Sequence, residues 1–320
     1  MATAGTDATA PGALGRDRPL LRRAWVRRAA MLAATVLLLW LTVQAVGAQA
    51  LLDGAAVLTP LSVVAALAVG LVVALSQALR WRVLAAGQGI RMPFRQAVRD
   101  CYASAFGNMV LPGGLGGDAA RLVVYRDQGR RRWWSPLLAV GAERLSGTAW
   151  LFTAATVVLT LAQAEVPALV AGVAAVVFLV AAVACMLGVP LNRKVLVWAA
   201  SAVSVAALLG LFLLGMAVLG GPVHAPVAVT GLASMSVPVG VGGWGVREFS
   251  VGALAPALGT SAERAVTMAA GYGLLATVST LPGAAVLLWT TVTRRRPQPP
   301  ETSGQLSPSF ARIRANEGDN

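Results

Sequence analysis

Six ionisable side chains lie within segments of this sequence that are otherwise apolar. They are Asp118, Arg121, Glu143, Arg144, Arg247 and Glu248. A guanidinium binds phosphate or carboxylate through two parallel hydrogen bonds, so Arg144 and Arg247 are candidates to hold an anionic head group. The three carboxylates would balance these charges, receive a cationic head group, or carry a proton that couples transport. The alternative is that such residues form internal salt bridges, for example Arg144 with Glu248, that fix helix packing.

The densest cluster of unusual residues is 236–250, where four glycines precede an adjacent Arg-Glu pair. The apolar run on either side is shorter than the roughly 20 residues that cross a bilayer. Irregular backbone at membrane depth is tolerated only where protein or a water-filled cavity surrounds it. The amides of Gly242 and Gly243 could bind an anion, or these glycines only permit close helix contact. Trp244 could stack on an acyl chain or mark the membrane interface.

A second glycine-rich segment, residues 101–117, lies between two arginine-rich stretches. Positively charged loops stay in the cytoplasm, so both ends of this segment should lie on the same side of the membrane. We expect a re-entrant hairpin or a pair of interfacial helices broken at Pro112; a cytoplasmic loop with an apolar patch is the alternative. Asn108 would hydrogen-bond across the hairpin or cap a broken helix, or make an ordinary interhelical contact.

The composition is that of a polytopic membrane protein. Of 320 residues, 57% are hydrophobic and 12% are charged, whereas soluble domains have about 25% charged residues. The net charge of +13 reflects arginines clustered between apolar spans, so we expect contact with anionic lipid head groups and no nucleic-acid partner. The cysteines and the single histidine lack metal-ligand spacing, and nucleotide-binding and zinc-protease motifs are absent. We therefore expect no cofactor and no metal.

We predict an all-α polytopic transmembrane helical bundle of six to eight spans with two broken or re-entrant helical elements. The expected long helices are 29–47, 57–79, 136–162, 166–189, 195–219 and 266–290. Between the last two, region 226–259 must cross an even number of times, either as a hairpin or as two short, tilted helices. The expected organisation is a basic cytoplasmic N-terminal segment (1–28), a transmembrane domain (29–292) and a disordered cytoplasmic tail (293–320).

Three blocks of sequence carry a resemblance to a known family. They are NMVLPGGLGGDAAR at 108–121, ERLSG at 143–147 and VPVGVGGWGVRE at 237–248, with LPG at 281–283. In order and spacing they resemble the lysylphosphatidylglycerol synthase transmembrane-region family, also described as flippase-like integral membrane proteins, over roughly residues 25–292. The resemblance implies an inner-membrane protein that handles a lipid or a lipid-linked sugar. In some relatives the region is fused to a soluble aminoacyltransferase domain and is associated with flipping the modified lipid.

These observations favour a translocase, rather than an enzyme, that moves an anionic or lipid-linked amphipath between leaflets of a bacterial plasma membrane. Membrane lipids are the expected partners. The expected substrate-binding residues are Asn108, Asp118, Arg121, Glu143, Arg144, Gly243, Trp244, Arg247 and Glu248. Two alternatives remain open. One is a membrane-embedded transferase that uses a lipid donor, which intramembrane carboxylates beside arginine would also suit. The other is a non-transporting partner that docks a separate lipid-modifying enzyme through its arginine-rich loops.

Overall fold

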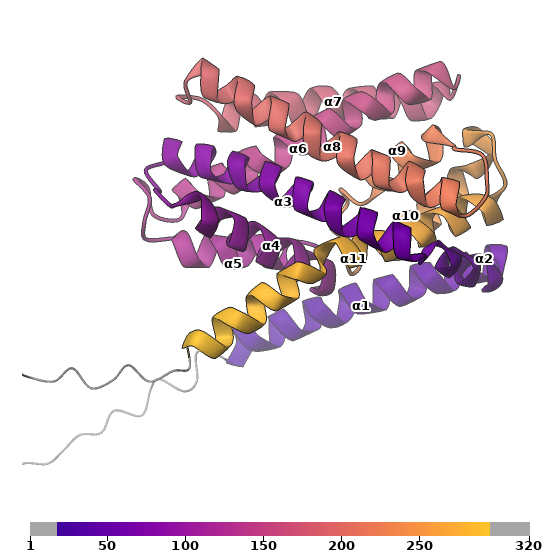
Figure 1. Ribbon diagram of the computed structural model, residues 1–320, viewed down its shortest axis with the longest axis horizontal. Coiled ribbons are helices and arrows are strands. Elements are labelled where there is room, and N and C mark those ends of the chain that lie inside the picture. Colours follow the sequence, from indigo (N-terminus) through magenta and orange to yellow (C-terminus); the bar gives the residue numbers. More distant parts are fainter. Residues whose placement is uncertain (1–17, 295–320) are drawn as a thin grey trace, which may run out of the picture. The chain divides into compact units, whose positions relative to one another are not determined.

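The computed structural model describes residues 18–294, and within them the fold is helical apart from two isolated β-bridges (Figure 1). The elements are α1 Arg18–Val46, α2 Gln49–Asp53, η1 Gly54–Val57, α3 Pro60–Gly87, α4 Phe94–Val110, α5 Gly116–Tyr125, α6 Trp134–Leu161, α7 Glu165–Cys185, α8 Leu191–Val218, α9 Ala225–Ser234, α10 Val246–Leu254, η2 Ala255–Leu258 and α11 Ala262–Arg294. The predicted all-α bundle is confirmed.

The chain divides into two compact units, Met1–Val286 and Leu287–Asn320. All packing and sites below belong to the described part of the first unit, residues 18–286. Much of the predicted N-terminal segment and most of the predicted tail fall at 1–17 and 295–320, outside the described residues.

Five helices in the described part of the chain are long and apolar enough to cross a membrane. They are α3, α6, α7, α8 and residues Ala262–Thr290 of α11. A sixth crossing results if Ala29–Gln44 and Gln49–Val57, which are bent by 106° relative to each other, count as one span. Each predicted long helix overlaps one of these segments, and the total agrees with the lower end of the predicted range.

The start of α3 is fixed by its own sequence. Thr59 precedes Pro60 and accepts a hydrogen bond from the Ser62 amide at 3.2 Å, while the Ser62 hydroxyl accepts one from the Thr59 amide at 3.0 Å. This reciprocal cap satisfies N–H groups that the first helical turn leaves free, and proline suits the first helical position. From this start, α3 runs side by side with α8 and also packs on α6 and α4.

Glycines let several helices approach each other more closely than any side chain would allow. They are Gly70 of α3 near Ser279 of α11, Gly117 of α5 near Ser104 of α4, and Gly283 of α11 near Tyr102 of α4. In each pair a Cβ on the glycine would lie 2.2 Å from the main-chain oxygen of its neighbour. Such contacts drive helix association in a bilayer, where apolar side chains gain little by leaving lipid. They hold α11 and the α4–α5 pair together.

Helices α4 and α5 form the predicted hairpin around residues 111–115, which we call the first break. The two helices are antiparallel: Gln96 and Asp100 of α4 both hydrogen-bond Tyr125 at the end of α5, and Ser104 contacts Gly117 near its start. Neither helix is among the segments apolar and long enough to span.

The region 226–259 consists of α9, α10 and η2, and residues 235–245, which we call the second break, join α9 to α10. These helices have 10 and 9 residues, or about 15 Å each at 1.5 Å per residue, about half of a 30 Å hydrocarbon core. The two breaks touch: the Gly113 amide donates to the Gly240 carbonyl at 2.7 Å, and Pro112 forms an antiparallel bridge with Val241. Gly240 has a φ of 87°, a conformation that other residues rarely adopt.

Candidate lipid-binding site

A cavity of about 470 Å³ lies among α3, α4, α6, α8 and α11, and both breaks contribute to its wall. Gly114 of the first break and Pro238 and Gly243 of the second line it. Its charged lining residues are Arg80, Glu143 and Arg144, and much of the remaining wall is apolar. The cavity therefore combines an apolar interior with one group of charges, which is the pattern an amphipathic molecule requires.

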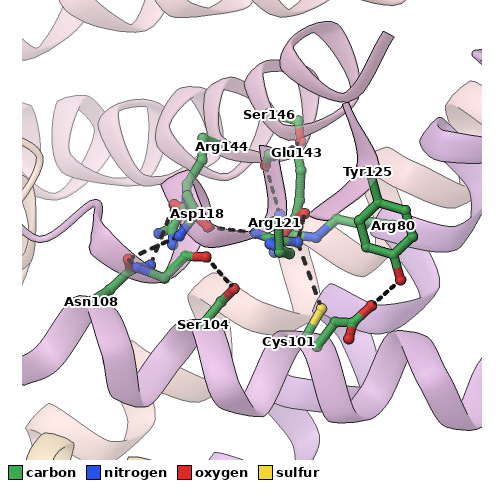
Figure 2. Close-up of polar contacts among 12 residues, drawn as sticks. Arg80, Cys101, Ser104, Asn108, Asp118, Arg121, Tyr125, Glu143, Arg144 and Ser146 are labelled. Atoms are coloured by element: carbon green, nitrogen blue, oxygen red, sulfur yellow. Dashed lines mark hydrogen bonds and ion pairs between the residues drawn. The ribbon is translucent and has the colours of Figure 1, made fainter. Parts of the chain in front are cut away.

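The four predicted charges of the first two sequence blocks form one ion-pair cluster (Figure 2). Arg121 is at its centre, with Nη2 at 2.5 Å from Asp118 Oδ1 and Nη1 at 2.7 Å from Glu143 Oε2. These three side chains are at most 5% exposed. The indole of Trp81 faces Arg121, with its ring centroid 4.9 Å from Cζ. Buried charges need such partners, and the cluster joins α5 to α6.

Asn108 positions Asp118, one of the two acidic members of this cluster. Its Oδ1 accepts hydrogen bonds from the amides of Gly117 at 2.8 Å and Asp118 at 3.3 Å, and its Nδ2 donates to Asp118 Oδ2 at 3.3 Å. The side chain thus satisfies N–H groups in the first turn of α5 and also bonds across the hairpin. Asn108 therefore both caps a helix and bonds across the hairpin, the two structural roles that the sequence suggested, and it also lines the cavity.

Arg144 differs from the rest of the cluster because it is accessible. Its Nε lies 2.7 Å from Asp118 Oδ2, yet its side chain is 42% exposed whereas that of Asp118 is 5% exposed. Because Arg144 lines the cavity, an anion inside can reach this guanidinium. Asp118 would keep Arg121 and Asn108 as partners if Arg144 turned to another anion.

Arg80 is a cavity residue that the sequence analysis missed. The helix expected at 57–79 ends before Arg80, but α3 continues to Gly87 and buries Arg80. Its Nη1 donates to the Glu143 carbonyl at 3.2 Å and to Ser201 Oγ at 3.0 Å. The signal was the continuing helical spacing of apolar residues beyond Arg80, at Trp81 and Leu84, which are both buried.

Arg247 and Glu248 lie elsewhere, behind the cavity wall. Both are fully buried, and the Arg247 guanidinium pairs with Glu248 Oε1. Glu248 Oε2 accepts the Gly245 amide at 2.8 Å, which caps α10. Gly273 of α11 makes room for this arrangement, because a Cβ there would lie 2.8 Å from the Arg247 Cζ. Neither charged residue lines the cavity, so the expected phosphate contact of Arg247 is not available in this conformation.

Of the two remaining predicted residues, Gly243 lines the cavity and Trp244 does not. Gly243 has a φ of 79°. Trp244 is half-buried, with its ring centroid 5.0 Å from the Arg247 Cζ, a cation–π distance. It therefore supports the buried ion pair, and it is not among the lining residues. No group of three or more potential metal ligands occurs within the described residues.

A double-variant experiment tests whether the Arg247–Glu248 pair is structural. Arg247→Leu should lower the free energy of unfolding by about 3–5 kcal/mol, because it leaves a buried carboxylate without its partner. Adding Glu248→Gln should recover much of this loss, since an amide oxygen can still accept the Gly245 N–H and carries no charge. Denaturant unfolding of the purified variants in detergent measures both values. A double variant no more stable than Arg247→Leu alone would contradict a structural role.

Residues 28–220 match the model of a family described as lysylphosphatidylglycerol synthase TM region. The match covers more than half of the chain and includes the α4–α5 hairpin and the Glu143-Arg144 pair. It ends before the second break, so the resemblance of residues 237–248 lies outside the matched range. No match to the chain was found among curated proteins or among solved structures.

Proposed function

This integral membrane protein belongs to the lysylphosphatidylglycerol synthase transmembrane-region family, and we propose that it moves an anionic or lipid-linked amphipath between the two leaflets of a membrane. We also propose a bacterial plasma-membrane location with both termini in the cytoplasm, because the arginine-rich loops would then lie inside. Membrane lipids are the proposed partners.

The observation that supports this proposal most strongly is that one cavity is lined by two members of the ion-pair cluster, Glu143 and Arg144, and by residues of the two breaks, whereas Asp118 and Arg121 lie behind its wall. Its volume of about 470 Å³ falls within the roughly 300–1,000 Å³ of typical ligand pockets. A polar head group fits the charged part, while acyl chains need only apolar surroundings. Transporters commonly bind their substrates where discontinuous helices meet inside the membrane.

The cluster offers a physical route for a head group to bind and leave. In this conformation Asp118 neutralises Arg144. An incoming phosphate would exchange with Asp118 at this guanidinium, and Asp118 would remain paired with Arg121. Because one ion pair replaces another, the exchange avoids exposing an unpaired charge, which is the most costly event inside a membrane.

The breaks supply the element that would have to move. The one backbone hydrogen bond that is found between them, from the Gly113 amide to the Gly240 carbonyl, belongs to the Pro112–Val241 bridge, and a single bond of this kind is a small barrier to separation. Residues from each break line the cavity, so parting them would change its access to one leaflet. In this mechanism the long helices form the frame and the two short helical pairs form the gate.

A vesicle assay tests the proposal. The purified chain is reconstituted with a trace of a head-group-labelled anionic phospholipid, and a membrane-impermeant quencher reports the label that reaches the outer leaflet. Vesicles with the native chain should expose inner-leaflet label much faster than vesicles without protein. Equal rates in the two preparations would contradict the proposal.

A further inference from the structure

Arg80 is a buried cation that forms no direct ion pair among the described residues, although the charge of the Glu143 carboxylate is near enough to act on it. The side chain is 4% exposed, and its Nη1 contacts are the Glu143 carbonyl and the Ser201 hydroxyl, both of which are neutral. Its Nε has no hydrogen-bond partner in the described part of the chain. Arginine stays protonated in proteins, so α3 places a full positive charge in the bundle with incomplete compensation, which is unfavourable.

Arg80 and the ion-pair cluster together carry a net positive charge. Arg80, Arg121 and Arg144 carry three positive charges against the two negative charges of Asp118 and Glu143, which leaves +1. A further carboxylate, Asp100, accepts a hydrogen bond from the Tyr125 hydroxyl and does not line the cavity. The charged residues that line the cavity are Arg80, Glu143 and Arg144, so this lining carries a net charge of +1.

Arg80 lines the cavity although it is buried, and its surroundings there are small or neutral. Gly147 follows Glu143 by one helical turn, and a Cβ there would lie 3.1 Å from Arg80 Nη1. Gly147 also lines the cavity, as do three neutral polar residues on the adjoining helices. These residues are Gln77 of α3, Thr148 of α6 and Ser204 of α8. A guanidinium fork with neutral donors around it is a common arrangement for binding phosphate.

We infer that Arg80 binds a negatively charged phosphate group inside the cavity, together with the accessible Arg144. This rests on the proposed function only where it identifies that phosphate as the head group of the transported amphipath; the binding itself does not require transport. The same chemistry could be supplied by a lipid phosphodiester or by inorganic phosphate. If Arg80 served only to tie α3 to α6 and α8, its replacement would leave the preference for anionic lipid unchanged, because Arg144 would still be present.

The test compares two phospholipids with the same phosphodiester and different head-group charge. Phosphatidylglycerol is anionic, whereas the choline of phosphatidylcholine cancels the phosphate charge. Each is titrated onto the purified full chain in a neutral detergent, and the rise in unfolding temperature gives the affinity. The native chain should bind phosphatidylglycerol more tightly, and Arg80→Gln should weaken this binding about tenfold or more. Arg82→Gln removes the same charge from an exposed position of α3 and should leave the affinity unchanged.

Further arms separate the sources of the phosphate and allow for a folding defect. Inorganic phosphate that stabilises the chain and competes with phosphatidylglycerol would identify a general phosphate site; no effect would identify a site for the lipid phosphodiester. If Arg80→Gln does not fold, the affinity of Arg80→Lys for phosphatidylglycerol tests the inference instead. An ammonium lacks the two-pronged geometry of a guanidinium, so this variant should bind the lipid several-fold more weakly. Equal binding of the two lipids by the native chain would overturn the inference. So would native affinity in Arg80→Gln, or in Arg80→Lys if the glutamine variant does not fold.

Failure of the Arg80 anion site can be distinguished from failure of the proposed translocase function. A chain that binds phosphatidylglycerol through Arg80 but does not exchange lipid between leaflets would keep the anion site and remove the translocase. A chain that translocates lipid with native affinity and rate in Arg80→Gln would keep the translocase and remove the anion site.

Discussion

An Arg144→Gln variant should translocate a labelled anionic lipid about 10- to 100-fold more slowly than the native chain. Hydrogen bonds to charged groups contribute roughly 1.5–3 kcal/mol, and each 1.4 kcal/mol corresponds to a factor of ten. Arg144 is the one member of the ion-pair cluster that combines an exposed guanidinium with a place in the cavity lining. Its loss should therefore weaken head-group binding while the frame stays intact. The vesicle assay described above measures the rate.

The matched control removes a positive charge away from the cavity. Arg264 lies exposed in the first turn of α11, and Arg264→Gln should translocate at the native rate. Asp118 keeps Arg121 and Asn108 as partners in the Arg144→Gln variant, so the unfolding temperature should change little. A correctly folded Arg144→Gln protein with native translocation would exclude Arg144 from the head-group site.

The membrane-spanning helices could be predicted because the thickness of the bilayer sets the length of the apolar run that crosses it, and such runs are visible in the sequence. Residues 166–189 were expected as a helix, for example, and α7 occupies Glu165–Cys185 with its valines and leucines exposed. The α4–α5 hairpin was predicted for a similar reason, since arginine-rich stretches on both sides require the chain to return. The hydropathy of a segment and the charge of its flanks depend only on neighbouring residues, so both can be determined from a single sequence.

Arg80 was missed because hydropathy marks where lipid contact ends, and a helix can continue beyond that point. Arg80 lies in the part of α3 that packs against α6 and α8, where Glu143 and Ser201 supply polar contacts. These partners are 63 and 121 residues away along the chain. Polar partners for a buried arginine are brought to it by tertiary packing, and this packing cannot be seen in the sequence alone.

The partner of Glu248 was also misjudged. A pairing with Arg144 was considered, whereas Glu248 pairs with the residue before it, Arg247. Consecutive residues on a helix normally do not face each other. Here Glu248 turns back to accept the Gly245 amide, and this brings its carboxylate within reach of the guanidinium. The cap at the start of α10 determines the ion pair, and the positive φ of Gly245 allows that cap to form.

The second large effect is expected from fixing the two breaks together. Pro112 and Val241 are opposite each other in an antiparallel bridge, where Cα atoms lie about 4.5–5.5 Å apart, within the range that a disulfide spans. Cysteines at these positions, in a chain whose free Cys101 and Cys185 are replaced by serine, should cross-link on oxidation. Neither Pro112 nor Val241 lines the cavity, so the cross-link should leave head-group binding intact while it prevents the breaks from parting.

Translocation by this one double-cysteine protein, before and after reduction, is the most direct test of a gate between the breaks. The account predicts almost no translocation when the cross-link is complete and recovery to near the native rate after a reductant is added. Single-cysteine variants at Pro112 and at Val241, treated in the same way, should remain active throughout. Native translocation by fully cross-linked protein would contradict the account, because lipid would then pass while the two breaks stay joined.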